Sequence, residues 1–285
     1  STQDIDYIAL SFVQSANDVK TLRKMLKNLG SRAKIIAKIE TSSAIRNIEQ
    51  IIQEADAVMI ARGDLAFETI PEAVPLEQRK IIGLGRQFKK PTIVATQMLA
   101  SMTEFSEPTR AEVSDVATAV IVGADCVMLS DETAIGKHPL EAVKVMKRVV
   151  TYTEENTVVK AQFSLPSVQT RQSAISSAVI SLAKEVGAKA IVAETKSGAT
   201  AAQIASFRPD IPIIAVTSDV RAAQQLAIVY GIKSYVRPAE QYAATKLTNW
   251  LKQKKVLKSG DIIVTTSGKH PGVVGATDTI KVRVL

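Results

Sequence analysis

The chain has 285 residues, 46% of them hydrophobic and 22% charged, and its formal net charge is +8. This composition is typical of a globular protein, and the apolar runs are shorter than the roughly 18 residues of a membrane-spanning helix, so no membrane partner is expected. The single cysteine, Cys126, excludes an internal disulfide and favours a reducing, cytoplasmic location. The positive charge suits anionic ligands. Only 4% of the residues are aromatic, and the basic run at 252–258 alternates with apolar residues, so no nucleic acid is expected as a partner.

Five short apolar runs in the first half of the chain each end in polar or charged residues. The stretches between them repeat apolar residues at helical spacing, as over 19–26 and 44–52, so the local unit is a strand followed by a helix. Such units build a parallel sheet, either open and doubly wound or closed as a (β/α)8 barrel. A barrel is favoured because every run ends in functional side chains. The runs end at Ser11, at Lys38 and Glu40, at Asp64, at Thr96, and at Ser130 to Glu132.

The number of repeats predicts an incomplete barrel. A complete barrel takes about 250 residues, or about 31 for each unit, whereas the five units here end near Arg148. We therefore expect residues 1–156 to form the carboxyl-terminal part of a TIM-type barrel, strands 4 to 8, followed by a linker at 157–170.

The second half of the chain, 171–285, alternates helical and strand patterns and predicts a three-layer α/β domain. Two of its loops, 195–200 and 265–275, are rich in glycine and hydroxyl residues and follow strands. The first loop precedes a helix, so its backbone N–H groups would hold a phosphate, although a tight turn explains each loop separately. Strands are expected at 190–194, 212–217, 234–238, 261–266 and 279–284.

Carboxylates end two runs that should be neighbouring strands. Glu40 and Asp64 would face the same barrel mouth, and two carboxylates suit Mg²⁺ or Mn²⁺, which leaves its other positions to water and phosphate oxygens. Lys38 adds a positive charge on the same strand face, and a metal with a lysine is suited to neutralising a transferring phosphoryl group. A structural Lys–Glu pair at the barrel rim is the alternative. The other strand ends add hydroxyl and carboxyl groups at Thr96, Ser130 and Glu132.

Five motifs carry a resemblance to the pyruvate kinase family. In order and spacing, the chain resembles that family's consecutive active-site motifs, and the similarity extends from about Asp6 to the carboxyl terminus. It implies a (β/α)8 barrel without its first three strands and without the lid domain that the family inserts after the third strand, followed by the family's C-terminal α/β domain. The motifs are KIE at 38–40, ARGDL at 61–65, ATQML at 95–99, PTRAEVSDVA at 108–117 and MLSDETA at 128–134.

The resemblance implies transfer of a phosphoryl group from phosphoenolpyruvate to ADP, which yields pyruvate and ATP in glycolysis. It implies that Glu40 and Asp64 bind the divalent metal and that Lys38 stabilises the phosphoryl group in flight. Backbone N–H groups at Gly63 and Asp64, with the Thr96 hydroxyl, would hold the substrate carboxylate. The resemblance further assigns a proton relay to Ser130 and Glu132.

Regulation and assembly are implied in the same way. A phosphosugar effector would bind the two loops of the second domain. The family's K⁺ site would lie in the barrel half that this chain lacks, so we expect a homo-oligomer or association with that half, and no activity from the chain alone. The matching effector positions are Thr195, Ser197, Gly198, Thr200, Ser267 and Gly268.

Two departures and two alternatives remain open. Ala66 and Asp131 stand where the family usually has glycine; alanine would add strain if its position needs positive φ, and the aspartate adds negative charge near an anionic substrate. The alternative functions are a regulatory or phosphosugar-binding module and a metal-dependent lyase acting on phosphoenolpyruvate or pyruvate.

Overall fold

The computed structural model describes residues 4–157, 170–240, 242–268 and 277–285. The chain divides into two compact units, 1–164 and 165–285, which we call unit 1 and unit 2. Nearly all of the expected linker and most of the 265–275 loop lie outside the described residues. Among the helices of the described ranges, none has the length and hydropathy needed to cross a bilayer.

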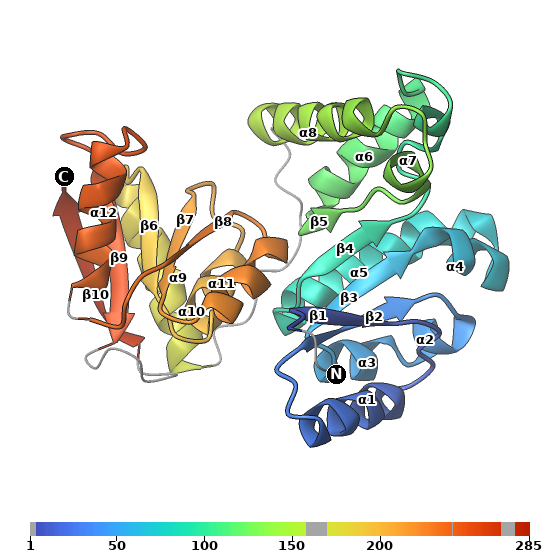
Figure 1. The fold of residues 1–285 in the computed structure, drawn as a ribbon, viewed down its shortest axis with the longest axis horizontal. Helices are drawn as coiled ribbons and strands as arrows, with labels where there is room; N and C mark the ends of the chain where they lie inside the picture. The colour runs from blue at the N-terminus through green and yellow to red at the C-terminus, as the bar shows by residue number, and fades with distance from the viewer. Residues whose placement is uncertain (1–3, 158–169, 241, 269–276) are drawn as a thin grey trace. The chain divides into compact units, whose positions relative to one another are not determined.

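Unit 1 is built on a five-stranded parallel sheet whose strands follow one another in chain order (Figure 1). This is the α/β pattern predicted from the repeated strand and helix signals. The strands are β1 (Tyr7–Leu10), β2 (Lys34–Ile39), β3 (Ala57–Ala61), β4 (Thr92–Ala95) and β5 (Cys126–Val127). The helices are α1 (Ala16–Asn28), α2 (Ser42–Arg46), α3 (Ile48–Glu54), α4 (Arg62–Glu68), α5 (Val74–Phe88), α6 (Arg110–Val122), α7 (Asp131–Ala134) and α8 (Pro139–Asn156), with short 3₁₀ turns η1 (Pro71–Ala73) and η2 (Ala100–Thr103).

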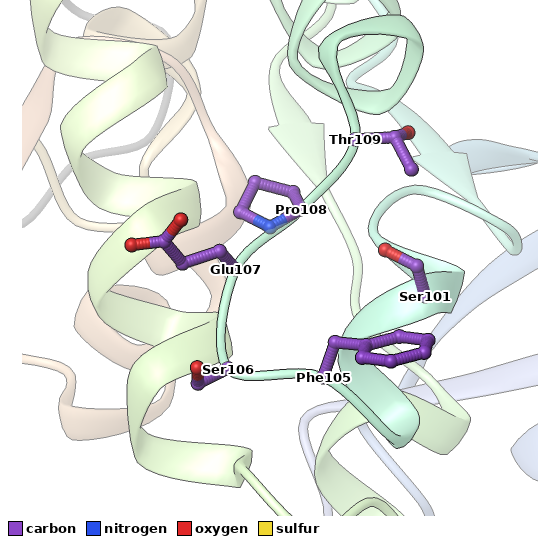
Figure 2. Close-up of a pocket in the computed structure, with 6 residues that line it drawn as sticks. All are labelled: Ser101, Phe105, Ser106, Glu107, Pro108 and Thr109. Atoms are coloured by element: carbon purple, nitrogen blue, oxygen red, sulfur yellow. The ribbon is translucent and has the colours of Figure 1, made fainter.

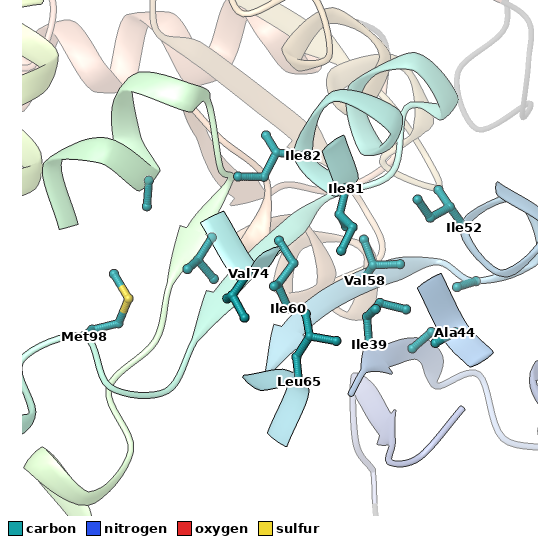
Figure 3. Packing of buried hydrophobic residues seen from close by; sticks show 14 of the residues in the cluster. Ile39, Ala44, Ile52, Val58, Ile60, Leu65, Val74, Ile81, Ile82 and Met98 are labelled. Atoms are coloured by element: carbon teal, nitrogen blue, oxygen red, sulfur yellow. The ribbon is translucent and has the colours of Figure 1, made fainter. Parts of the chain in front are cut away.

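The core of unit 1 lies between the sheet and its helices. Alternate strand residues, such as Ile39 on β2 and Ile60 on β3, point to the helices because successive side chains of a strand face opposite sides. Figure 3 shows them packed with Leu65 of α4 and with Ile81 and Ile82 of α5. All residues of β3 and β4 are buried, as is typical of the central strands of a parallel sheet.

The fifth strand is shorter than the sequence indicates. The apolar run continues through Met128 and Leu129, but β5 contains only two residues, and Met128 adds one further backbone hydrogen bond, to the Val94 carbonyl at 2.9 Å. The chain then leaves the strand direction at Ser130 (φ −118°, ψ −101°), which precedes α7. An edge strand has a partner on one side only, so fewer hydrogen bonds hold it extended.

Carboxylates fasten the amino ends of neighbouring strands. Asp56, just before β3, accepts the Ile35 N–H of β2 at 2.9 Å and pairs with Arg23. Asp125, just before β5, accepts the Thr92 N–H of β4 at 2.9 Å. These bonds fix the sheet register at the edge opposite to the predicted site.

Unit 2 is a three-layer α/β/α domain. Four parallel strands and one antiparallel edge strand occur in the order β10, β9, β6, β7, β8. The strands are β6 (Ala190–Glu194), β7 (Ile213–Thr217), β8 (Ile232–Val236), β9 (Ile262–Gly268) and β10 (Thr277–Val284). The helices are α9 (Arg171–Glu185), α10 (Ala199–Ala205), α11 (Val220–Gln225) and α12 (Ala243–Gln253), with the 3₁₀ turn η3 (Leu226–Ile228).

Alternation along β6 divides the core of unit 2 into two. Ile191 and Ala193 pack with α9 and α10 on one face, whereas Ala190 and Val192 pack with α12 on the other. The expected strand at 234–238 lies two residues earlier in the structure, and α11 ends at Gln225 and is followed directly by η3.

Close packing between α5 and β4 explains a glycine in the middle of a helix. A Cβ atom at Gly85 would lie 2.3 Å from Thr92 Cγ2 and 3.0 Å from the Lys90 carbonyl oxygen. Thr92 is fully buried, and its N–H and hydroxyl both bond to Asp125, so its methyl group has little freedom to move.

We expect Gly85→Ala to destabilise unit 1 by about 1–3 kcal/mol through overpacking, although alanine usually stabilises a helix interior by about 1 kcal/mol. Urea unfolding followed by amide hydrogen exchange in β3 and β4 measures the change. The double variant Gly85→Ala/Thr92→Ser lacks the clashing methyl but keeps the hydroxyl. Gly85→Ala should therefore cost less stability in the Thr92→Ser background than in the parent. An undiminished stability of Gly85→Ala would show that Thr92 yields freely.

Candidate active site

The predicted site residues of unit 1 lie in the last residues of its parallel strands or in the segments that follow them. The pairing of Ile39 with Ile60 and of Ala61 with Ala95 aligns the ends of β2, β3 and β4 along one edge of the sheet. The candidate functional side chains come from this edge and from the segments that leave it.

Lys38 and Glu40 form an ion pair at the end of β2. Lys38 Nζ lies 2.5 Å from Glu40 Oε1 and also donates to Ser11 Oγ at 2.9 Å. Glu40 is only 1% exposed, and its Oε2 accepts the Phe12 N–H at 2.6 Å. Oε1 has no hydrogen bond from a described residue, and its contact with Lys38 is ionic. A buried carboxylate with one oxygen held by a single ammonium group can still coordinate a cation.

Asp64 lies in the first turn of α4, directly after β3. Its side chain is exposed and has no hydrogen-bond or ion-pair partner among the described residues. These residues contain no cluster of three or more His, Cys, Asp or Glu side chains that could hold a metal. The donor set at the ends of β2 and β3 is therefore two carboxylates, Glu40 and Asp64. It fits Mg²⁺ or Mn²⁺, which accept one or two protein carboxylates with water and substrate oxygens.

Thr96 and Gly63 contact each other across the ends of β4 and β3. The Gly63 N–H donates to Thr96 Oγ1 at 2.9 Å, and the Thr96 hydroxyl donates to the Ala95 carbonyl at 2.6 Å. The two groups assigned to a substrate carboxylate thus satisfy each other in this structure. A carboxylate would have to replace Thr96 Oγ1 as the acceptor of the Gly63 N–H.

The backbone at Thr96 is strained. Thr96 and Gln97 have φ values of +69° and +53°, a left-handed conformation that L-residues other than glycine rarely adopt, and a residue in such a conformation costs on the order of 1–3 kcal/mol. Phe12, at the end of β1, also has positive φ, at +54°. Away from helix ends, the positive-φ residues described in unit 1 therefore gather at this edge of the sheet.

Arg62 was not predicted as a site residue, although it lies inside the ARGDL motif. Its side chain is buried and donates to the carbonyl oxygens of Thr96 and Gln97 and to Asp115 of α6. The sequence of the motif does not indicate whether the arginine side chain points to solvent or into the protein. Only the fold shows that Asp115, 53 positions later, is its partner.

Ser130 and Glu132 do not form the hydroxyl–carboxylate pair that the sequence suggested. Glu132 is 2% exposed, and its oxygens accept two backbone donors, the Ser130 N–H at 2.7 Å and the Leu99 N–H at 3.1 Å. The Ser130 hydroxyl has no hydrogen bond to a described residue. Glu132 thus fastens the loop after β4 to the loop after β5, and a proton passing through Ser130 Oγ would not move directly to this carboxylate.

The two residues that depart from the family pattern, Ala66 and Asp131, lie in different structural environments. Ala66 lies inside α4 and is absent from the positive-φ residues, so the expected strain does not arise there, and alanine is the better helix former. Asp131 is exposed at the first turn of α7, where a negative charge is favoured by the helix dipole.

The predicted effector loop of unit 2 is partly closed by its own hydrogen bonds. The Thr200 side chain is 5% exposed and its hydroxyl bonds to the Thr277 hydroxyl at 2.8 Å. Gly198 has φ +84° and a Cβ there would lie 3.1 Å from Leu226, so both the conformation and the space require glycine. Ser197 is exposed and Thr195 is partly exposed. Ser267 and Gly268 end β9, beside β6, because Thr266 pairs with Ala193.

A pocket of about 370 Å³ opens beside η2 and α6 (Figure 2). The chain from Phe105 to Thr109 curves around it, with Ser101 on the opposite side. Glu112 fastens both sides, because it accepts the N–H and hydroxyl of Ser101 at 2.7 and 2.6 Å and those of Thr109 at 2.8 and 2.9 Å. Burial alone would raise the pKa of Glu112, but these four hydrogen bonds outweigh it and hold the pKa below its ordinary value.

The chain is similar in sequence and in structure to known proteins. The family model of the pyruvate kinase barrel domain matches residues 1–143, and that of the pyruvate kinase alpha/beta domain matches residues 173–283. Pyruvate kinase 2 of Synechocystis is 41% identical over 99% of this chain and 48% of its own length; pyruvate kinase of Mycobacterium tuberculosis is 42% identical over 98% and 60%. The crystal structure of a pyruvate kinase from Cryptosporidium parvum matches with a TM-score of 0.91 and 35% identity, over 99% of this chain and 59% of that one.

A parallel sheet built from repeated strand and helix units, followed by a second, three-layer α/β domain, defines a two-unit α/β protein. The chain belongs to the pyruvate kinase family. It spans about half to three-fifths of the length of the relatives named above.

Because the pKa of Glu112 is depressed in the folded protein, its ionised form contributes stability that is fully present above the ordinary value of 4.5 and is lost as the pH falls through the lower folded-state pKa. We expect Glu112→Gln to be less stable than the parent near neutral pH, and the difference to shrink below about pH 4. Urea midpoints between about pH 6 and about pH 3 measure this. Glu107→Gln, an exposed carboxyl on the same pocket, is the matched control. A constant gap between Glu112→Gln and the parent across this range would contradict the assignment.

Proposed function

We propose that the carboxyl edge of unit 1 carries the transfer of a phosphoryl group from phosphoenolpyruvate to ADP, which yields pyruvate and ATP in glycolysis. The observation that carries the proposal is the Lys38–Glu40 pair at the end of β2, a strand adjacent to β3, which is followed in the chain by the exposed Asp64. The five-stranded sheet corresponds in this proposal to strands 4 to 8 of a (β/α)8 barrel. Since the chain spans only part of its relatives, the whole reaction is proposed for a protein that contains this site together with the remaining strands.

The residues of the chain divide the work by their chemistry. Glu40 and Asp64 would hold a divalent cation, which when bound supplies positive charge to the phosphoryl oxygens. Lys38 lies within reach of the same oxygens and stabilises the negative charge that grows as the phosphoryl group moves and an enolate remains. The Gly63 and Asp64 N–H groups and the Thr96 hydroxyl bind and orient the substrate carboxylate.

The proton that converts the enolate to pyruvate must reach its methylene carbon. The Ser130 hydroxyl is free of described hydrogen bonds and is the donor that we propose, with Glu132 in a positioning role because both of its oxygens accept backbone N–H groups. A K⁺ site, a cytoplasmic location and self-association or association with a chain carrying the other strands stay predictions.

Turnover should depend on Lys38. In a complete enzyme that contains this site together with the remaining strands, assayed with phosphoenolpyruvate, Mg²⁺ and ADP, Lys38→Met should lower kcat by roughly 10²–10³-fold while KM stays within a few-fold, because the charge that it stabilises grows only in the transition state. Lys34→Met, at the other end of β2, is the matched control and should retain turnover. Equal pyruvate formation without ADP would mean that the phosphoryl group passes to water, and would contradict transfer to a nucleotide.

Binding of Mn²⁺ alone tests the site without turnover. Glu40→Gln and Asp64→Asn should each weaken it, whereas Lys38→Met should not, because removing the ammonium group frees Glu40 Oε1. Unchanged Mn²⁺ affinity in both carboxylate variants would remove the metal site and the phosphotransferase proposal with it.

The loop at 195–200 is proposed as a binding site for a phosphosugar effector, in a narrower form than the sequence suggested. Ser197 and the backbone N–H groups of the loop are the candidate donors, with Ser267 and Gly268 beside them, whereas the Thr200 hydroxyl serves the contact with Thr277. Millimolar fructose or glucose phosphates should raise the thermal midpoint of unit 2, by linkage to a native-state ligand. Ser197→Ala should reduce this shift and Thr200→Val should not; an unmoved midpoint in the parent would leave the loop as an ordinary turn.

A further inference from the structure

The strained turn after β4 needs something to hold it. Thr96 and Gln97 both have left-handed backbone conformations, and neither is glycine. Such a conformation persists only where the surrounding structure over-determines it. For threonine the requirement is stronger, because the branched Cβ crowds the backbone at positive φ.

The guanidinium group of Arg62 makes the contacts that meet this need. Its Nη2 donates to the Thr96 carbonyl at 2.8 Å and to the Gln97 carbonyl at 3.1 Å, and it also lies 3.0 Å from Met98 Sδ. The two carbonyl oxygens belong to the two strained residues. Since a residue's ψ angle sets the direction of its carbonyl group, these hydrogen bonds select one conformation of the turn.

Asp115 holds the guanidinium in place. Arg62 Nη1 donates to Asp115 Oδ1 at 2.6 Å, and the arginine side chain is 10% exposed. Arg62 Nε is buried without a hydrogen-bond partner among the described residues, so the charge is incompletely satisfied. A buried ion pair is weak evidence for stability, because desolvation offsets the attraction. The pair instead fixes the local geometry, because Arg62 connects α6, the start of α4 and the turn after β4.

This geometry places two functional groups. In the selected turn, Thr96 Oγ1 lies 2.9 Å from the Gly63 nitrogen, and Gly63 directly follows Arg62 in the chain. Arg62 therefore fixes the Gly63 N–H through its own backbone and the Thr96 hydroxyl through its side chain. A lysine would not replace it, because one ammonium group lacks the planar fork that reaches a carboxylate and two carbonyls together.

We propose that Arg62, oriented by Asp115, is a positioning residue that holds the turn at Thr96 and Gln97 in its left-handed conformation, so that the Thr96 hydroxyl and the Gly63 N–H converge on one carboxylate-binding position. The identity of the carboxylate rests on the proposed function, whereas the positioning does not. Loss of the clamp should release the turn first and weaken ligand binding as a consequence.

The test compares variants of the full 285-residue chain by two readouts at named atoms. Amide hydrogen exchange at Gly63 reports its bond to Thr96, and the three-bond HN–Hα coupling at Thr96 reports φ. Arg62→Met, Arg62→Lys and Asp115→Asn should each accelerate Gly63 exchange by about 10-fold or more, as expected for loss of a hydrogen bond in a partly buried site, and should shift the coupling away from its left-handed value.

Two further variants separate positioning from stability. The double variant Arg62→Met/Asp115→Leu removes both charges, so it should regain much of the stability lost in Arg62→Met, yet Gly63 exchange should remain fast because the carbonyls still lack their donor. Arg62→Met/Gln97→Gly should slow the exchange again, because glycine adopts positive φ without strain. Arg23→Met removes an arginine from the amino edge, where it pairs with Asp56, and should leave Gly63 unaffected.

Gly63 exchange and Thr96 coupling equal to those of the parent in Arg62→Met and Asp115→Asn would overturn the proposal. A Gly63 exchange rate that returns to the parent value in Arg62→Met/Asp115→Leu, together with the stability, would also overturn it. Titration of phosphoenolpyruvate with Mn²⁺ present then adds the ligand. Where the parent binds it, the clamp variants should bind about 10-fold or more weakly; where the parent does not bind, the proposed function is in doubt while the exchange results still decide the clamp.

Discussion

Side-chain charges that bond to the backbone of a neighbouring loop are the constraint on which the site in unit 1 depends. Glu40 accepts the Phe12 N–H, Arg62 donates to the Thr96 and Gln97 carbonyls, and Glu132 accepts the Ser130 and Leu99 N–H groups. Each of the three is at most 9% exposed. Hydrogen bonds to charged groups are stronger than neutral ones, and they lie where a parallel sheet provides no ladder, beyond the ends of its strands.

This arrangement explains why strain and buried charge occur together. Left-handed residues at the ends of β1 and β4 are bonded through their backbone groups to Glu40 and Arg62. A charged side chain that must enter the protein to hold a strained turn carries a desolvation cost, and neither feature would persist for stability alone. Together they hold hydrogen-bond donors in place before a ligand binds, so these groups do not have to be ordered during binding.

The parallel sheet of unit 1 was predictable from the sequence, since alternation of apolar runs and helical spacing is a local property of the chain. The partners of the charged residues were not. The family resemblance implies that Ser130 and Glu132 act together, but the carboxylate accepts the Ser130 amide N–H and that of Leu99, 33 positions away. The partners of Arg62 also come from other loops, so its place in the motif does not reveal them. The length of β5 also depends on context, because an edge strand ends where its one neighbour stops supporting it.

Similar hydrogen bonds fasten the two edges of the sheet, but they leave different polar groups without described partners. At the amino edge, Asp56 and Asp125 accept N–H groups of the adjoining strand and also contact Arg23 and the Thr92 hydroxyl, respectively. At the carboxyl edge the same kind of fastening leaves the Asp64 carboxylate and the Ser130 hydroxyl without described partners. A polar group that a fold holds in place but does not satisfy is available to a ligand. The function proposed for this edge therefore rests on the polar groups that its hydrogen bonds leave unsatisfied as much as on the residues that they join.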